Sequence, residues 1–251
     1  MRVPYGTGPG TRTRGIRRDR RAGMICLMAE HTDSPQVLEV SALSIGILGG
    51  TGDQGRGLAR RFALAGHTVL IGSRSAQRAQ EAAEDIGVRG AENAVVAAEA
   101  DIVIVAVPWE GHKDLLESLK EHLDGKIVVD CVNPLGFDKQ GAYALPVEEG
   151  SAAQQAAAVL TGSRVVAAFH HVSAVLLLDP SVESIDLDVF VLGDDREATD
   201  VVQALASRIS GARGVYAGRL RNAGQVESLT ANLISINRRY KSHAGLRVTD
   251  V

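Results

Sequence analysis

Short apolar runs alternate with helix-like segments along the chain from Ser44 onward. The runs predicted as strands are apolar throughout rather than alternating in polarity, and they cover residues 44–48, 68–71, 102–107, 126–130, 164–169 and 189–192. Helical spacing of apolar residues is found between them, at residues 55–65, 76–85, 112–122 and 197–210. Unbroken apolar strands are typical of a parallel sheet that helices cover on both faces. The pattern therefore predicts an α/β fold with a doubly wound parallel sheet.

A longer helix is predicted after Gly218 and reaches about Tyr240. Its apolar residues recur at spacings of three and four, at Val226, Leu229, Leu233 and Ile236. Such a stripe is more often used for core or dimer packing than for binding a ligand. We expect this segment to form a helical C-terminal extension of the α/β domain.

Residues 1–43 mix Gly, Pro, Arg and Thr without apolar periodicity, which predicts a disordered leader. The leader is rich in arginine, with seven arginines and one acid in residues 1–24. A basic start before the apolar stretch 22–29 is a feature of secretion signals, although this stretch is shorter than a typical signal requires. Two other interpretations stay open, namely initiation at Met24 or Met28 and a solvated tail. The domain proper is predicted to span residues 44–251.

Composition narrows the class of protein. Hydrophobic residues make up 45% and charged residues 23%, the usual balance of a globular protein. The net charge is −3 and the chain after the leader is acidic, which argues against a nucleic-acid partner. Two cysteines, Cys26 and Cys131, cannot form a disulfide framework, so we expect a reducing, cytoplasmic location. The longest apolar stretch, residues 165–178, is 14 residues long, whereas a membrane-spanning helix needs roughly 20.

A glycine-rich turn follows the first predicted strand and reads Gly49-Gly50-Thr51-Gly52-Asp53-Gln54-Gly55. Gly50, Gly52 and Gly55 satisfy G-x-G-x-x-G, whose glycines allow a tight turn, close approach of the backbone to a pyrophosphate, and close contact of helix and strand. The helix N-terminus then offers free N–H groups to the phosphates. No G-K-[ST] closes the motif, so it is not a triphosphate P-loop. Between a strand and a helix, the turn predicts a Rossmann-type dinucleotide site.

The end of the second predicted strand indicates which dinucleotide binds. NAD sites usually place Asp or Glu here to hold the ribose 2′-hydroxyl. This chain has Ser73 and Arg74 at that point, with Arg78 one helical turn later. Arginine binds phosphate through forked, charge-assisted hydrogen bonds, so these residues favour NADP. The alternative interpretation is a solvated basic helix start.

Two further segments follow predicted strands, where the crevice of a parallel sheet holds ligands. Pro108 and Trp109 follow one strand, and Asn133-Pro134 follows another. The prolines are equally compatible with plain strand termination. Trp109 is interpreted either as a residue that covers the nicotinamide end of the dinucleotide or as one that packs on the hydrophobic core.

The pair His170-His171 follows the predicted strand 164–169. A metal-ligand role is least favoured because no Cys, Asp or Glu lies at a familiar ligand spacing. A pocket wall beside a ring is favoured, while a general acid or base and satisfied structural histidines stay open. Neighbouring residues on an extended segment point to opposite faces, so we expect only one of the two to reach the crevice. Nucleophilic catalysis has no support, because G-x-S-x-G is absent and a nearby Asp130 would raise the thiol pKa of Cys131.

An ordered set of motifs gives the chain a family resemblance. The motifs are Gly49–Gly52, Gly72–Arg74, Val107–Glu110, Ala168–His170, Gly193–Asp195 and Val226–Thr230. With them, residues 44–251 resemble the NADPH-dependent reductases of coenzyme F-420, the 8-hydroxy-5-deazaflavin. The resemblance implies hydride exchange between NADP and the deazaflavin, usually in a homodimer. Where archaeal relatives have proline, this chain has Ser173.

The resemblance also implies roles for particular residues. Thr51, Gly52, Asp53, Gln54, Ser73, Arg74 and Arg78 correspond to the NADP site. His170, Val172 and Ala174 correspond to the place where nicotinamide and deazaflavin meet, and the C-terminal helices are expected to complete the deazaflavin pocket. Direct hydride transfer between two rings needs positioning more than side-chain chemistry, so no metal and no certain catalytic residue are expected.

Other functions stay open at this stage. An NADP-dependent reductase of another substrate, such as an imine or a ferric chelate, would have a similar first half. An NADP-sensing regulator without turnover is the alternative from a different class.

Overall fold

The computed structural model describes residues 40–251, so most of the predicted leader lies outside the described residues. Eight strands of this part form one sheet: β1 (Ile45–Leu48), β2 (Val69–Ser73), β3 (Arg89–Glu92), β4 (Ile102–Val105), β5 (Ile127–Asp130), β8 (Arg164–Ala167), β9 (Leu187–Gly193) and β10 (Ala212–Gly218). Two more, β6 (Leu135–Asp138) and β7 (Gly141–Ala144), form an antiparallel hairpin.

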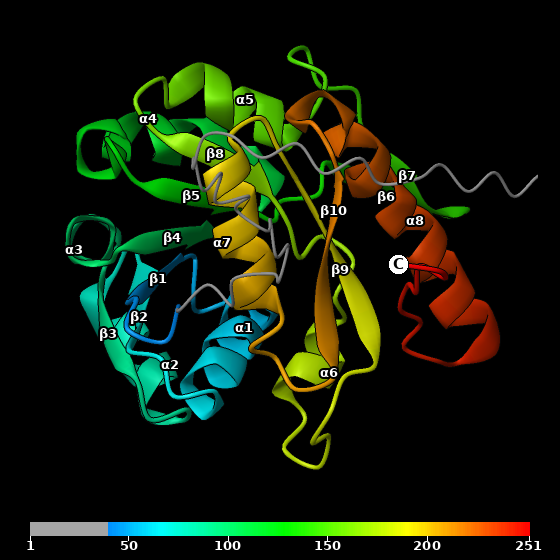
Figure 1. Cartoon of the computed structure of the whole chain (residues 1–251), viewed down its shortest axis with the longest axis horizontal. Coiled ribbons are helices and arrows are strands. Elements are labelled where there is room, and N and C mark those ends of the chain that lie inside the picture. The colour runs from blue at the N-terminus through cyan, green and yellow to red at the C-terminus, as the bar shows by residue number, and fades with distance from the viewer. Residues whose placement is uncertain (1–39) are drawn as a thin grey trace, which may run out of the picture. The chain divides into compact units, whose positions relative to one another are not determined.

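The helices of the described residues are α1 (Asp53–Leu64), α2 (Ala76–Glu84), α3 (Asn93–Glu99), α4 (His112–Leu123), α5 (Ala152–Val159), α6 (Ala174–Leu178), α7 (Arg196–Ala206) and α8 (Ala223–Tyr240). Short 3-10 turns precede α4 at Trp109–Gly111 and α8 at Leu220–Asn222. Helices cover both faces of the sheet (Figure 1). One buried cluster joins the sheet to α1, α6 and α7, and a second joins it to α3, α4 and α5.

The strand order of the sheet is β10-β9-β8-β5-β4-β1-β2-β3. From β3 to β8 all neighbours are parallel, in the order 3-2-1-4-5-6 that defines a Rossmann fold. The predicted α/β Rossmann-type sheet with a helical C-terminal extension is therefore confirmed. One edge differs from the expectation of a parallel sheet, because β9 and β10 are parallel to each other but antiparallel to β8.

Several elements gave no clear pattern in the sequence. Strand β3 reads Arg-Gly-Ala-Glu and has no apolar run, because it lies half-exposed at the sheet edge. A Cβ on Gly90 in this strand would lie 2.2 Å from the Ala79 carbonyl oxygen. Position 90 therefore requires glycine because α2 packs closely against the strand, and not because the strand is apolar. The β6–β7 hairpin is likewise short and partly exposed.

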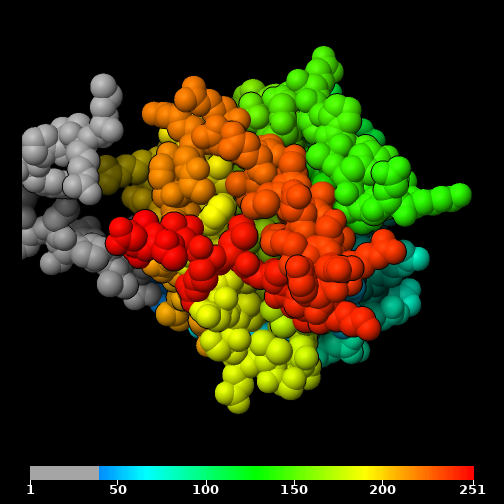
Figure 2. Space-filling view, turned by 90° about the vertical axis from the view of Figure 1, so that its right-hand side faces the viewer, coloured from blue at the N-terminus to red at the C-terminus, as the bar shows by residue number. Residues whose placement is uncertain are grey.

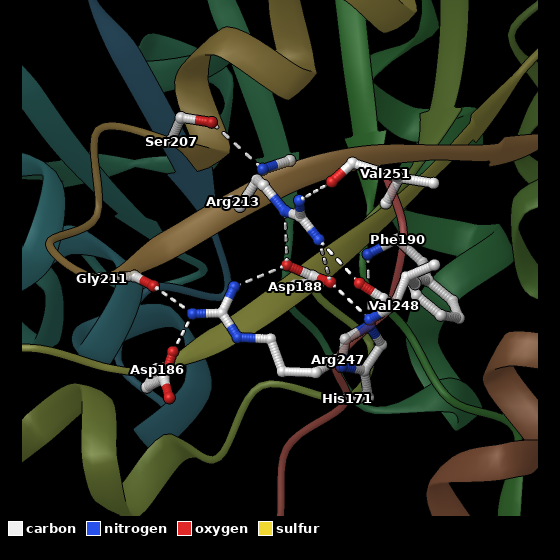
Figure 3. A network of polar contacts seen from close by, with 11 residues as sticks. His171, Asp186, Asp188, Phe190, Ser207, Gly211, Arg213, Arg247, Val248 and Val251 are labelled. Atoms are coloured by element: carbon white, nitrogen blue, oxygen red, sulfur yellow. Dashed lines mark hydrogen bonds and ion pairs between the residues drawn. The ribbon is translucent and has the colours of Figure 1, made fainter.

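The chain after α8 returns to strand β9. Lys241 ends α8 in the left-handed conformation at φ 53°, and the Asp188 N–H then donates to the Leu246 carbonyl at 2.7 Å. The fully buried Asp188 carboxylate accepts from Arg213 at 2.8 and 2.9 Å and from Arg247 at 2.8 Å (Figure 3). It also accepts from the Val248 N–H at 2.6 Å. Hydrogen bonds from Arg213 hold the pKa of Asp188 below its ordinary value. One carboxylate thus joins β9, β10 and the C-terminal tail.

We expect Asp188→Asn to lower the melting temperature by about 5–10 °C, because a charge-assisted hydrogen bond contributes roughly 1.5–3 kcal/mol. The substitution keeps the volume of the side chain but removes the charge that pairs with both guanidinium groups. Asp186→Asn is the matched control, since Asp186 also contacts Arg247 but its side chain is 84% exposed. Thermal unfolding by circular dichroism measures both. Equal, small shifts would show that the tail does not depend on the buried carboxylate.

Candidate functional site

The glycine turn between β1 and α1 is packed against the sheet. A Cβ on Gly50 would lie 2.6 Å from the Ile71 Cβ, and one on Gly55 would lie 2.8 Å from the Gly50 Cα. Both positions therefore exclude any side chain on packing grounds. A Cβ on Gly52 meets only the Gly49 carbonyl oxygen, at 3.7 Å. The fold thus does not require glycine at position 52, which leaves its exposed backbone open to a ligand.

Gly52 is also the N-cap residue of α1. Its position provides no side-chain hydrogen bond to the helix. The N–H groups of the first turn of a helix have no intrahelical partner and carry the positive end of the helix dipole. This end of α1 is consequently suited to bind an anion such as a pyrophosphate.

A cavity of about 540 Å³ opens beside this turn. Its size falls in the range of small-molecule sites. It is lined by Gly49, Thr51 and Gly52 from the turn, Ser73, Arg74, Ser75 and Arg78 after β2, Asn93 of α3, Ala106, Val107, Pro108, Glu110 and Gly111 after β4, and Leu115 of α4. Three segments far apart in the sequence therefore meet at the carboxyl ends of β1, β2 and β4, where a Rossmann sheet binds its ligand.

The segment after β2 carries the cationic side of the cavity. Ser75 caps α2 by accepting from the Arg78 N–H at 3.4 Å, and the Ser73 hydroxyl accepts from the Ser75 N–H at 3.3 Å. Arg74 and Arg78 are exposed. Within residues 40–251 neither guanidinium has an ion-pair or hydrogen-bond partner. The cavity therefore has two free cations on its rim.

Asn93 is a lining residue that sequence reasoning missed. It starts α3 and is only 7% exposed, yet its Oδ1 has no hydrogen-bond partner in the part of the chain that the structure describes. An unpaired buried acceptor on a residue that lines a cavity is suited to receive a hydrogen bond from a ligand. No signal pointed to it, because β3 and the start of α3 lack a recognisable pattern.

Three side chains hold the backbone after β8. Phe169 adopts the left-handed conformation at φ 65°, which is uncommon for a residue with a bulky side chain. The Gln54 amide donates to the Phe169 carbonyl at 3.2 Å. The next carbonyl, of His170, accepts from the Asn133 amide at 2.9 Å and from the Thr230 hydroxyl at 3.2 Å. Helix α1, the segment after β5 and helix α8 thus converge on this turn.

The two neighbouring histidines are buried in different surroundings. His171 accepts from the Phe190 N–H at 3.2 Å and meets the Phe190 ring edge-on, so it completes the edge of β9 (Figure 3). His170 is 3% exposed and its ring lies close to the backbone of Cys131 and Val132, without a side-chain partner for either ring nitrogen among the described residues. Burial lowers the pKa of each imidazole to about 4, so both are uncharged at neutral pH. His170 is accordingly the histidine with unused hydrogen-bonding capacity.

The predicted residues do not all line one cavity. His170, Val172 and Ala174 lie outside the lining of the cavity at the glycine turn. Pro108 lines it, whereas Trp109 is half-buried against the second core cluster and stacks on His112. Cys131 is buried, and its thiol donates to the Val105 carbonyl at 3.0 Å. Burial, with the Asp130 charge adding to it, raises the pKa of this thiol, as expected.

Residues 40–251 contain no features of two other classes of site. No three His, Cys, Asp or Glu side chains gather there in a way that could hold a metal ion. None of the helices in this range has the length and apolar character needed to cross a membrane.

The strand order, the packed glycine turn and the cation-rimmed cavity define a Rossmann-type protein with a dinucleotide site. Residues 44–134 match the family model described as NADP oxidoreductase, coenzyme F420-dependent. The F420-dependent NADP reductase of Methanothermobacter thermautotrophicus is 40% identical over 229 residues, which are 86% of this chain and 98% of that protein. The enzyme of the same name from Methanocaldococcus jannaschii is 39% identical over 83% of this chain and 99% of its own length.

A solved structure agrees with these relatives. The protein from Arthrobacter sp. FB24, provisionally assigned as an F420-dependent NADP reductase, superimposes with a TM-score of 0.73 at 27% identity, over 83% of this chain and all of that one. The chain belongs to the family of F420-dependent NADP reductases. The family resemblance inferred from the sequence motifs is therefore confirmed.

We expect Arg74→Ala to weaken NADP binding by roughly one to two orders of magnitude and to leave NAD binding nearly unchanged. The reason is that one charge-assisted hydrogen bond to the 2′-phosphate contributes about 1.5–3 kcal/mol, and NAD lacks this phosphate. Calorimetry with both dinucleotides measures the difference. Arg196→Ala is the control, since this side chain is 95% exposed at the start of α7. Equal loss for NADP and NAD would show that Arg74 supports the fold instead.

Proposed function

We propose that this protein is an oxidoreductase that transfers a hydride reversibly between NADP(H) and the deazaflavin coenzyme F-420. The observation that carries the proposal is the match to nearly the whole length of reductases of that name. The cavity supports the NADP half, because its rim carries two unpaired arginines and no acid after β2. A cytoplasmic location belongs to the proposal and is supported by the free thiol of Cys131.

For NADP, we assign the pyrophosphate to the turn at the N-terminus of α1, with Gly50, Thr51, Gly52, Asp53, Gln54 and Gly55. Ser73, Arg74 and Arg78 are assigned to the 2′-phosphate. Pro108 is assigned to the wall toward the nicotinamide end, and Trp109 to the same segment, which it anchors from behind the lining of the cavity. The free N–H groups of α1 and the exposed guanidinium groups supply positive charge where the dinucleotide carries negative charge.

For the deazaflavin, we assign the segment that runs from His170 through Val172 to Ala174. Its support is the turn at Phe169, whose carbonyl and that of His170 are held by three side chains from separate elements. Thr230 makes one of these contacts, so α8 borders the segment. This supports the prediction that the C-terminal helices complete the second pocket.

The two coenzymes, when bound, supply the chemistry, because a hydride passes directly from one ring to the other. The task of the chain is to hold the two rings in a reactive arrangement and to exclude water from them. The uncharged His170 ring, buried and without a side-chain hydrogen-bond partner, is suited to contact a ring with polar edges. We therefore assign His170 to the pocket wall and not to a proton relay.

The decisive assay mixes chelator-treated protein, NADPH and oxidised coenzyme F-420 and follows bleaching of the deazaflavin. We expect bleaching that survives metal removal. His170→Ala should slow hydride transfer by up to about a hundredfold, because a small misplacement of reacting rings has an effect of that size. NADP binding by this variant should stay within about threefold of wild type, as should turnover by the control His122→Ala, which alters an exposed residue of α4.

Three other results of these assays would contradict parts of the proposal. Absence of bleaching by a protein that binds NADPH would leave a reductase of another substrate or an NADP-sensing regulator. Bleaching that disappears after chelation would refute a metal-free reaction. Unchanged hydride transfer in His170→Ala would remove this residue from the pocket wall.

We also infer that the protein is a homodimer. Apolar side chains are exposed on α8 and on the neighbouring β6–β7 hairpin, among them Phe137 at 69%, Ile236 at 39% and Tyr240 at 74%. Figure 2 shows α8 and the tail that follows it across one open face of the molecule. Exposed apolar residues on adjacent elements are typical of association surfaces.

Light scattering should therefore give a mass of about twice the 26.5 kDa of one chain. The double substitution Ile236→Glu with Tyr240→Glu should reduce the mass to that of a monomer, because buried carboxylates would oppose the contact. Leu64→Glu is the matched control, since Leu64 is also an exposed apolar residue, at 66%, but belongs to α1. A wild-type protein that scatters as a single chain would contradict the inference.

A further inference from the structure

A buried ion pair lies behind the dinucleotide cavity and is not used by the function proposed above. His112 begins α4 and Asp130 ends β5, and both side chains are completely buried. The His112 Nε2 lies 2.6 Å from the Asp130 Oδ2, and its Nδ1 lies 3.0 Å from the Gln155 Oε1. Both nitrogens of this imidazole are therefore engaged by oxygen atoms.

The hydrogen-bond directions assign a charge to this pair. The Gln155 amide nitrogen donates to Glu149 at 3.2 Å, so its oxygen faces His112 and the His112 Nδ1 must carry a proton. The Asp130 carboxylate also accepts from the Val132 N–H at 3.1 Å and receives the His112 Nε2 with its other oxygen. Because an ionised Asp130 carboxylate only accepts hydrogen bonds, the Nε2 beside it also carries a proton, and the ring is then an imidazolium between a carboxylate and an amide.

Two acidic neighbours, Asp130 of β5 and Glu227 of α8, favour this state. Burial by itself lowers the pKa of His112, but the Asp130 charge and hydrogen bonds with Asp130 and Gln155 leave it above the ordinary value. Glu227 of α8 adds to this effect, and burial raises its own pKa to about 7, so its negative charge grows as the pH rises. His170 faces Asp130 as well but is uncharged at neutral pH.

Trp109 connects this pair to the cavity. The Trp109 ring stacks on the His112 ring with centroids 5.6 Å apart and planes 30° apart. A cation against the face of an indole ring is attracted by its π system. Trp109 turns inward, while its neighbours Pro108, Glu110 and Gly111 line the cavity. The indole is thus the anchor of the short turn that forms one wall of the site.

We propose that the His112–Asp130 pair positions the Pro108–Gly111 wall of the NADP site by holding Trp109 in its stacked place. His112 is then a positioning residue for the cofactor, acting through Trp109. The proposal rests on the proposed function, since that function makes this cavity the NADP site. It predicts that the wall loosens when the imidazolium loses its charge, as the pH rises through the elevated pKa of His112.

The test uses intrinsic fluorescence of the full chain, because Trp109 is its only tryptophan. A protonated imidazole in contact with an indole quenches its emission more strongly than a neutral one. Wild-type emission should be weak at neutral pH and rise severalfold at alkaline pH. His112→Gln should emit strongly at every pH and bind NADP up to about tenfold more weakly, because the strength of the lost contact limits how far the wall shifts from its binding arrangement.

Asp130→Asn serves as the second variant, because it keeps the size of the side chain and removes the charge that sustains the imidazolium. Its emission should rise at a lower pH than that of wild type. His122→Gln is the matched control, since this residue lies exposed on the same helix. Its emission profile and its affinity for NADP should equal those of wild type.

A further measurement keeps the proposal testable if the variants fold poorly. The dissociation constant of wild type for NADP, measured across the same pH range, should increase in step with the emission of Trp109. An affinity that stays constant through the emission change, or emission that does not respond to pH in wild type, would overturn the proposal. A wild-type protein that fails to bind NADP at all would instead contradict the proposed function.

Discussion

The close packing of the glycine turn on the end of β2 is the constraint on which the site depends. The Gly50 N–H donates to the Gly72 carbonyl at 2.9 Å, and no side chain fits at Gly50 against Ile71. This contact brings the N-terminus of α1 beside the arginines that follow β2. Two separate sources of positive charge, helix N–H groups and guanidinium groups, therefore face one cavity. Because the backbone itself makes the contact, the arrangement does not rely on flexible side chains.

Polar contacts between residues far apart in the sequence hold helix α8, strand β9 and the C-terminal tail in place. The carbonyl of His170 is held by Asn133 and Thr230, and the tail is held by Asp188 on β9. These contacts fix where α8 lies relative to the strand ends. A family whose reaction brings two coenzymes together needs this precision, because hydride transfer depends on the separation and angle of two rings. The chain supplies it with hydrogen bonds between segments that lie far apart in the sequence.

Two buried carboxylates, Asp130 and Asp188, each have hydrogen-bond partners. Asp188 is matched by two guanidinium groups, and Asp130 by the His112 imidazole and a backbone N–H. Such groups would be unfavourable in isolation, since burial without a partner costs several kcal/mol. Here they join elements that the hydrophobic clusters alone do not align. The sequence placed Asp130 at a strand end beside Cys131 but gave no sign of its pairing with His112, because 18 residues and a helix separate the two members of the pair.

The sequence by itself determined the alternation of apolar strands and helices, the glycine turn and the choice of arginine over an acid after β2. Each of these depends on local spacing: continuous apolar runs, three glycines at set positions, and residue types at one strand end. Tertiary structure alone decided that β9 and β10 reverse direction, that Asn93 lines the cavity, that Trp109 turns inward onto His112, and that His171 completes a strand edge while His170 has no side-chain partner. These outcomes depend on contacts between residues far apart in the chain. Such contacts leave no periodic trace, because a single hydrogen bond or ring contact constrains one position rather than a repeating set.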